Sequence, residues 1–211
     1  LIILIIYAIF FLLPKPTNVS GDNPLMKDST GKPILIAHGG GNHEFPDNTL
    51  EAFYHAYSID PNVMMETDVN LTKDGVILLS HDTTLDRKTT LQNADIIDTN
   101  YSDLITDLVD FSYQNSVVPN SNGYNVSGEL TRYENYMGES VTPLDVNYPN
   151  GVSPRNDSIF LATTLEDLIV SFPNNAINVE VKQEGQVGLD ALDKIIELMD
   201  QLDGGYQTYS R

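Results

Sequence analysis

The chain is 211 residues long, enough for one ordinary domain, and its 30 acidic against 11 basic residues give a formal net charge of −19. That acidity argues against general nucleic-acid binding, which depends on Lys and Arg side chains that neutralise phosphate. The chain has no cysteine, which excludes disulfides, zinc–thiolate sites and thiol nucleophiles.

An apolar run opens the chain: residues 1–13 are continuously apolar, and Pro14 ends the run. About 20 apolar residues span a bilayer, so this run matches the C-terminal part of such a span. We predict a membrane anchor at residues 1–14, with the following domain extracytoplasmic. A cleaved signal segment of a secreted protein and a buried strand are the alternatives, although no small-residue cleavage site follows. Residues 15–32, rich in Pro, Asn, Ser, Asp and Gly, are predicted to be a linker.

Short apolar runs and helical patterns then alternate, which is typical of a parallel α/β fold. Strands are predicted at residues 34–38, 63–71, 76–80 and 176–182, and helices at residues 49–58, 165–171 and 189–202. The first strand lacks alternation, as expected for a strand covered on both faces. Asp47 or Asn48 is the predicted N-cap of the first helix.

Residues 83–158 are irregular and rich in Asn, Ser, Tyr, Pro and Gly. Stretches of this length without regular structure are uncommon inside compact domains unless they are functional or inserted. We therefore predict an insertion within a domain that spans residues 33–211.

Three carboxylates hold polar positions of these predicted strands. Glu66 and Asp68 are two residues apart and so share a strand face, and Glu180 lies in the later strand. Oxygen ligands suit a hard cation such as Ca²⁺ or Mg²⁺. A solvent-facing pair is the ordinary alternative for Glu66 and Asp68, but it fits a sheet interior poorly because unpaired buried charges are costly.

Two histidines, His38 and His81, each close a predicted strand near these carboxylates. Histidine titrates near neutral pH and serves as a general acid or base. His43 is interpreted as a loop residue and His55 as a structural residue of the first helix. The glycines at residues 39–41 allow a sharp turn and a close approach of the backbone to a ligand.

These segments resemble the glycerophosphodiester phosphodiesterase family, whose pattern is H-R-G, P-E-N-T-L-x-A-F, E-x-D-V-x-x-T-x-D-G and H-D-x-x-L-x-R-T-T. The matching positions are His38, residues 46–53, 66–69, 72–75, 81–82, 85, 87 and 89–90, with later matches at residues 164–167 and 177–182. The resemblance implies a (β/α)8 TIM barrel of the PLC-like phosphodiesterase type, truncated here to about its N-terminal half. The family carries an insertion where residues 83–158 lie.

The implied activity is metal-dependent hydrolysis of glycerophosphodiesters to glycerol 3-phosphate and an alcohol. A divalent cation would reconcile the acidity of the chain with an anionic substrate, because it inverts the local charge. The implied catalytic acid and base are His38 and His81, the implied Ca²⁺ or Mg²⁺ ligands are Glu66, Asp68 and Glu180, and the implied substrate-binding residues are Lys182, Asp47 and Gly39.

Two positions depart from the family pattern. Gly39 replaces the arginine of H-R-G, which is a bidentate phosphate ligand. Either the metal and Lys182 balance the phosphate charge in its place, or the activity is weakened or redirected to another diester. Asp47 replaces the glutamate of P-E-N-T with a carboxylate one methylene shorter. The alternatives are a related barrel phosphodiesterase acting on lysophospholipid or phosphoinositol headgroups, and a catalytically inactive membrane-tethered binding module.

Overall fold

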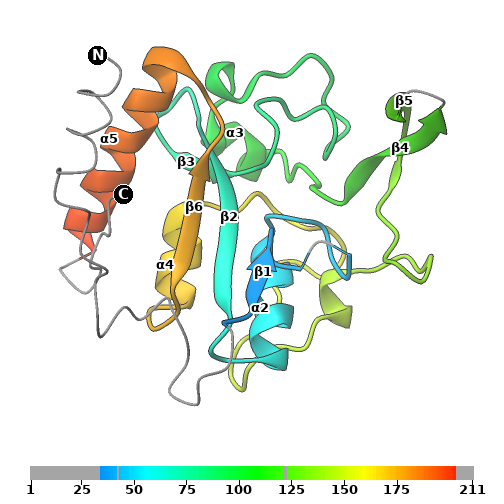
Figure 1. The fold of residues 1–211 in the computed structure, drawn as a ribbon, viewed down its shortest axis with the longest axis horizontal. Helices are drawn as coiled ribbons and strands as arrows, with labels where there is room; N and C mark the ends of the chain where they lie inside the picture. Colours follow the sequence, from blue (N-terminus) through cyan, green and yellow to red (C-terminus); the bar gives the residue numbers. More distant parts are fainter. Residues whose placement is uncertain (1–33, 42, 121–122, 203–211) are drawn as a thin grey trace, which may run out of the picture. The chain divides into compact units, whose positions relative to one another are not determined.

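A four-stranded sheet is built around the long strand β2 (Met64–Leu71) in the computed structural model, which describes residues 34–41, 43–120 and 123–202. β1 (Ile36–His38) and β6 (Ile177–Val181) pair with β2 in parallel, and β3 (Ile77–Leu79) pairs with it in the antiparallel direction (Figure 1). β6 occupies one edge of β2 over residues 65–69, so β1 and β3 share the other edge, one after the other.

The side chains of β2 alternate between a helical layer and the opposite face of the sheet. Met65 and Val69 point into a hydrophobic core that also contains residues of the helices α2 (Leu50–Ile59), α4 (Leu165–Ser171) and α5 (Gly185–Gln201). Because successive strand side chains point to opposite faces, Glu66 and Asp68 lie on the face away from these helices. The polar face of the sheet is thus the one that positions the candidate site.

The helices begin at side chains that cap them. The N-cap of α2 is Thr49, whose hydroxyl accepts from the Ala52 N–H, so the predicted cap at Asp47 or Asn48 is wrong. Asn48 cannot cap the helix because its side-chain amide is hydrogen-bonded to Thr67 and Asp68 of β2. α4 occupies the predicted residues and starts with a capping box between Thr164 and Asp167. α5 begins at Gly185, four residues before the predicted start at residue 189.

Residues 83–158, expected to be irregular, contain several short elements. They are the helical turns η1 (Ile96–Asp98) and η2 (Pro143–Asp145), the helix α3 (Tyr101–Thr106) and a hairpin of β4 (Tyr113–Asn120) with β5 (Gly123–Arg132). A second core, which includes Leu104, Phe111 and Phe160, supports them. Its apolar residues are widely scattered in the sequence, which is why periodicity did not reveal them.

The first strand was expected to be covered on both faces, and this expectation is wrong. Leu35 and Ile36 are 60% and 58% exposed, and among the described residues β1 pairs only with β2. The predicted anchor and linker lie outside the described residues. Within the described ranges, the structure has no helix that combines the length and the apolar character needed to cross a membrane.

Candidate active site

Three carboxylates meet on the polar face of the sheet. Glu66 and Asp68 project from β2, and Glu180 of β6 is paired in register with Asp68. One oxygen of each carboxylate lies within 4.8 Å of the others, and no other group of this kind is found among the described residues. Ca²⁺ binds oxygens at about 2.3–2.6 Å, so ligands of one ion lie no farther apart than about twice that distance. The donor set therefore fits one hard divalent cation.

Hydrogen-bond donors hold each carboxylate in place. The Gly39 N–H donates to Glu66 Oε2 at 2.9 Å, and Asn48 Nδ2 donates to Asp68 Oδ2 at 3.0 Å. The Lys182 Nζ lies 3.0 Å from Asp68 Oδ1 and 2.8 Å from Glu180 Oε1. Although loss of solvent lowers the pKa of Lys182, the bonds to Glu180 and Asp68 outweigh it and raise the pKa. The ammonium thus offsets the repulsion among the carboxylates.

The two predicted catalytic histidines lie at the same end of the sheet. His38 closes β1 opposite Glu66, and its Nε2 is 3.9 Å from Glu66 Oε2. His81 follows β3, where the Ser80 N–H donates to the Asp68 carbonyl oxygen at 2.9 Å. The imidazoles are 69% and 50% exposed, so both are open to solvent.

His81 reaches the site through the tight turn that Lys73, Asp74 and Gly75 predict between β2 and β3, and the structure confirms this turn. Parallel strand ends alone do not bring all the site residues together. β3 is antiparallel to β2, so its C-terminal end returns from the tip of β2 to the level of Asp68. The convergence therefore depends on a hairpin as well as on parallel strand ends.

Asp47, predicted to bind substrate, lies beside basic side chains instead of among the three carboxylates. Arg87 Nη2 is 3.3 Å from Asp47 Oδ2, and the buried Lys88 donates to the Asp47 carbonyl oxygen. Burial raises the pKa of Asp47, but the positive charges of Lys88 and Arg87 outweigh it and hold that pKa well below its usual value. Burial also lowers the pKa of Lys88.

The remaining histidines lie elsewhere. The exposed His43 accepts a backbone bond from the Tyr136 N–H, and His55 packs against Phe45 with ring centroids 4.8 Å apart. Burial lowers the pKa of His55. Neither belongs to the described carboxylate group. This placement matches their interpretation as loop and structural residues.

Sequence reasoning missed the supporting role of Asn48. Its Oδ1 accepts from the Thr67 hydroxyl at 2.8 Å and from the Asp68 N–H at 3.1 Å, while its Nδ2 contacts Asp47 and Asp68. Its φ of 57° is unusual outside glycine. The available signal was an asparagine directly before the N-cap residue Thr49, where the asparagine was taken for a possible cap itself.

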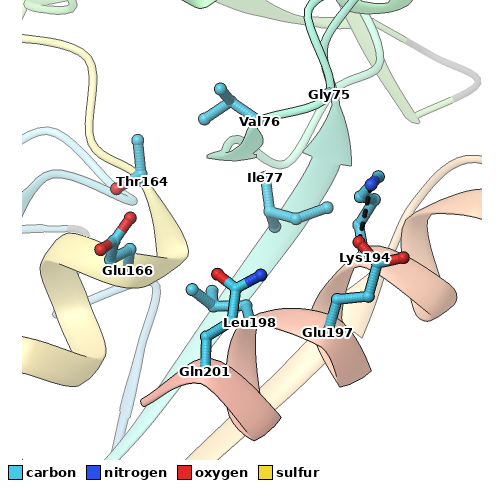
Figure 2. A pocket seen from close by; sticks show the side chains of 9 residues that line it. All are labelled: Gly75, Val76, Ile77, Thr164, Glu166, Lys194, Glu197, Leu198 and Gln201. Carbon is cyan, nitrogen blue, oxygen red and sulfur yellow. Dashed lines mark hydrogen bonds and ion pairs between the residues drawn. The ribbon is translucent and has the colours of Figure 1, made fainter.

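A cavity of about 220 Å³ lies away from these residues (Figure 2). The start of β3, the first turn of α4 and the C-terminal half of α5 form its walls. Lys194 and Glu197, both on α5, pair at 2.7 Å on one wall. None of the predicted site residues lines this cavity, so it has no place in the candidate active site.

The sequence profile of the Glycerophosphoryl diester phosphodiesterase family matches residues 38–200, well over half of the chain. The chain belongs to this family. Human lysophospholipase D is 26% identical to this family member over 162 residues, which cover 77% of this chain and 40% of that protein. A glycerophosphodiester phosphodiesterase of Caldanaerobacter subterraneus is 43% identical over 58 residues, which cover 28% of this chain and 24% of that protein.

Solved structures share the fold of this family member. A phosphodiesterase of Oleispira antarctica, in complex with the product sn-glycerol-3-phosphate, matches with a TM-score of 0.51 and 20% identity, covering 80% of this chain and 52% of that one. A glycerophosphoryl diester phosphodiesterase of Parabacteroides distasonis matches with a TM-score of 0.50 and 20% identity, covering 82% and 45%. These likenesses confirm the predicted α/β fold of the TIM-barrel type. The chain spans about half the length of these structures.

Proposed function

We propose that this family member catalyses metal-dependent hydrolysis of glycerophosphodiesters to glycerol 3-phosphate and an alcohol. The observation that carries the proposal is the geometry of the site. Three carboxylate oxygens lie within 4.8 Å of one another, and His38 and the strand end before His81 contact two of those three residues. The Oleispira antarctica phosphodiesterase, solved with glycerol 3-phosphate, supports the same reaction class.

Glu66, Asp68 and Glu180 are the residues that would hold the cation, because carboxylate oxygens suit Ca²⁺ or Mg²⁺. Bound there, the cation supplies positive charge that polarises the phosphoryl oxygens and orients the glycerol hydroxyls. Lys182, already beside Asp68 and Glu180, is placed to steady the phosphate as a point charge. The Gly39 N–H is engaged with Glu66, so Gly39 contributes to holding a metal ligand.

The histidines divide the proton transfers between them. His38 takes the proton of the attacking hydroxyl as the hydroxyl oxygen bonds to phosphorus. Attack by water gives glycerol 3-phosphate directly, whereas attack by a glycerol hydroxyl gives a cyclic phosphate, which water then opens to glycerol 3-phosphate. The bond from phosphorus to the leaving oxygen breaks, and His81 gives that oxygen the proton of its Nε2. We assign the acid role to His81 because Asp82 holds its Nδ1 at 2.8 Å, whereas His38 has a carboxylate only at 3.9 Å. A positioned general acid contributes about 10²–10⁴-fold.

A second candidate substrate class is lysophospholipid. The human and mouse lysophospholipases D match 77% and 79% of this chain, far more than the Caldanaerobacter enzyme does. The chemistry at phosphorus is the same, because both classes are diesters of glycerol phosphate. The two classes differ in whether the glycerol carries an acyl chain.

The substrate panel that tests both candidates uses the purified full-length protein with Ca²⁺ or Mg²⁺. Glycerophosphocholine should give glycerol 3-phosphate and choline, and lysophosphatidylcholine should give lysophosphatidic acid and choline if the second candidate holds. Complete chelation by EDTA should abolish both reactions. Turnover that survives chelation would contradict the metal mechanism. Lack of turnover by the wild type on every substrate would instead favour an inactive binding module.

The apolar run at residues 1–13 lies outside the described residues, and its role stays a proposal. We propose that it anchors the protein to a membrane with the catalytic residues on the extracytoplasmic side; secretion after cleavage is the alternative. Alkaline extraction of membranes tests this, because an anchored protein stays in the pellet and a secreted one is found in the medium.

A further inference from the structure

A row of charged groups begins at His81 and leads away from the candidate cation site. His81 Nδ1 lies 2.8 Å from Asp82 Oδ1, and Arg87 Nε donates to Asp82 Oδ2 at 2.6 Å. The two terminal nitrogens of Arg87 contact the two carboxylate oxygens of Asp47 at 3.4 Å and 3.3 Å. Arg87 therefore bridges two carboxylates that are far apart in the sequence.

The far end of this row is fixed to β2. Asn48 Nδ2 lies 3.2 Å from Asp47 Oδ2 and 3.0 Å from Asp68 Oδ2, so one amide group joins Asp47 to a carboxylate of the candidate cation site. Lys88, fully buried, holds Asp47 from the other side. Arg87 is thus attached to a carboxylate that has little freedom to move.

The backbone on both sides of His81 is also fixed. Asn70 Nδ2 donates to the carbonyl oxygens of Ser80 and Asp82 at 2.8 Å and 3.0 Å, and Asn70 lies on β2. What remains adjustable is the direction of the imidazole, which is half exposed. Within the described ranges of the chain, the hydrogen bond between His81 Nδ1 and Asp82 Oδ1 is the contact that restrains this ring.

The protonation of Asp82 decides which imidazole nitrogen keeps a proton. Burial raises the pKa of Asp82, but the hydrogen bond from His81 and the charge of Arg87 outweigh it, so the pKa lies below its usual value. An ionised carboxylate only accepts hydrogen bonds. His81 Nδ1 is therefore the N–H donor to Asp82, and Nε2 is the nitrogen that exchanges protons with substrate.

We propose that Arg87 is a positioning residue for His81: by clamping Asp82 against Asp47, it fixes the ring direction and tautomer that aim His81 Nε2 at the leaving oxygen. The inference rests on the proposed function, in which His81 is the general acid. Arg87 needs no contact with substrate for this role. Its loss would leave Asp82 free to rotate and His81 free to turn away.

A change of leaving group separates positioning of an acid from general structural support. Choline leaves as an alkoxide that needs a proton, whereas p-nitrophenolate leaves without one at neutral pH. The experiment measures kcat and KM of the full-length protein for glycerophosphocholine and for the p-nitrophenyl ester of glycerol phosphate. The variants are Arg87→Met, Arg87→Lys and, as an independent cut of the same clamp, Asp82→Asn.

Because a general acid contributes about 10²–10⁴-fold, Arg87→Met should lower kcat for glycerophosphocholine by at least about tenfold. The kcat for the p-nitrophenyl ester and both KM values should stay close to wild type. Arg87→Lys should restore part of the loss, and Asp82→Asn should reproduce the selectivity. Arg132→Met is the matched control, since the half-exposed Arg132 pairs with Asp110 outside the network of His81 and should affect neither substrate.

Equal losses on both substrates, or no loss on either, would overturn the positioning role. Thermal unfolding of each variant shows whether an equal loss on both substrates comes from misfolding. If Arg87→Met is misfolded, the comparison of the two substrates is made with Arg87→Lys, which keeps the charge. A wild type that turns over neither ester would overturn the proposed function and this inference with it.

Discussion

Asn48 uses every hydrogen-bonding position of its side-chain amide at the candidate site. It donates to Asp47 and Asp68, and it accepts from Thr67 and from the Asp68 backbone. The side chain is 1% exposed, so these bonds have no solvent alternative. Residues that hydrogen-bond to metal ligands orient those ligands. Asn48 makes such hydrogen bonds to Asp68, a predicted metal ligand.

We expect Asn48→Ala to weaken both the fold and the affinity for a divalent cation. Loss of partners for buried groups costs about 1–3 kcal/mol in the free energy of unfolding. Loss of an orienting partner lowers metal affinity by about 10–100-fold. Urea unfolding and calorimetric titration with Ca²⁺ or Mg²⁺ measure the two effects.

Asn175→Ala is the matched control. Asn175 Nδ2 donates to the carbonyl oxygens of Pro61 and Val63, at the end of β2 remote from the carboxylates. This variant should lose stability without losing cation affinity. Equal loss of affinity in both variants would mean that Asn48 acts through stability alone.

The depressed pKa of Asp47 predicts how stability depends on pH. Its folded-state pKa lies below the unfolded value of about 3.9, so its contribution is complete above that value and is lost as the pH falls through the folded pKa. Asp47→Asn leaves Lys88 buried without its counter-charge, which should cost on the order of 3 kcal/mol at neutral pH.

Urea unfolding of wild type and Asp47→Asn, from neutral pH to about pH 2, measures this contribution. The difference in unfolding free energy should be constant near neutral pH and shrink below about pH 4. A difference that stays unchanged through the acid range would show that the carboxylate charge of Asp47 is not its source.

At the scale of elements, the turn between β1 and α2 places His38 and Gly39 beside Glu66. Gly40 and Gly41 have φ values of 82° and 86°, which side chains rarely adopt. A Cβ at position 40 would lie 2.9 Å from the Ala52 Cβ of α2, whereas one at position 41 would meet nothing within 4 Å. The first glycine thus allows helix and turn to approach, and the second serves only the backbone conformation.

Gly40→Ala should therefore destabilise the protein more than Gly41→Ala. The left-handed conformation costs about 1–2 kcal/mol in either variant. The clash with Ala52 adds about 1–3 kcal/mol at position 40 alone. Chemical unfolding of the two variants side by side gives the difference, and equal destabilisation would contradict the close approach of turn and helix.

Most of the elements that hold the site were predictable from the sequence, because β2, β6, α4 and α5 have clear apolar periodicity. The meeting of Glu66, Asp68 and Glu180 followed from their polar positions on those strands. The antiparallel return of β3 was indicated by the turn residues Lys73, Asp74 and Gly75. The bridge made by Arg87 depends on tertiary pairing, which has no periodic signal. The roles assigned to these residues in catalysis and metal binding stay predictions.

At the scale of the whole molecule, the distribution of charge matters more than its total. The chain has only 11 Lys and Arg residues against 30 acidic ones. Three of the basic residues, Arg87, Lys88 and Lys182, lie in the networks around the candidate site. Their charge is largely matched by the nearby carboxylates, so the anionic substrate proposed above would need the further positive charge of a cation.

Direct measurement of cation binding to the three carboxylates tests the central claim. Calorimetric titration of the full-length protein with Ca²⁺ and Mg²⁺ should give one site per chain. Glu66→Gln, Asp68→Asn and Glu180→Gln should each weaken that site by more than an order of magnitude, while Glu197→Gln on α5 should bind as the wild type does. Equal binding by all four variants and the wild type would contradict the metal site and the phosphodiester chemistry derived from it.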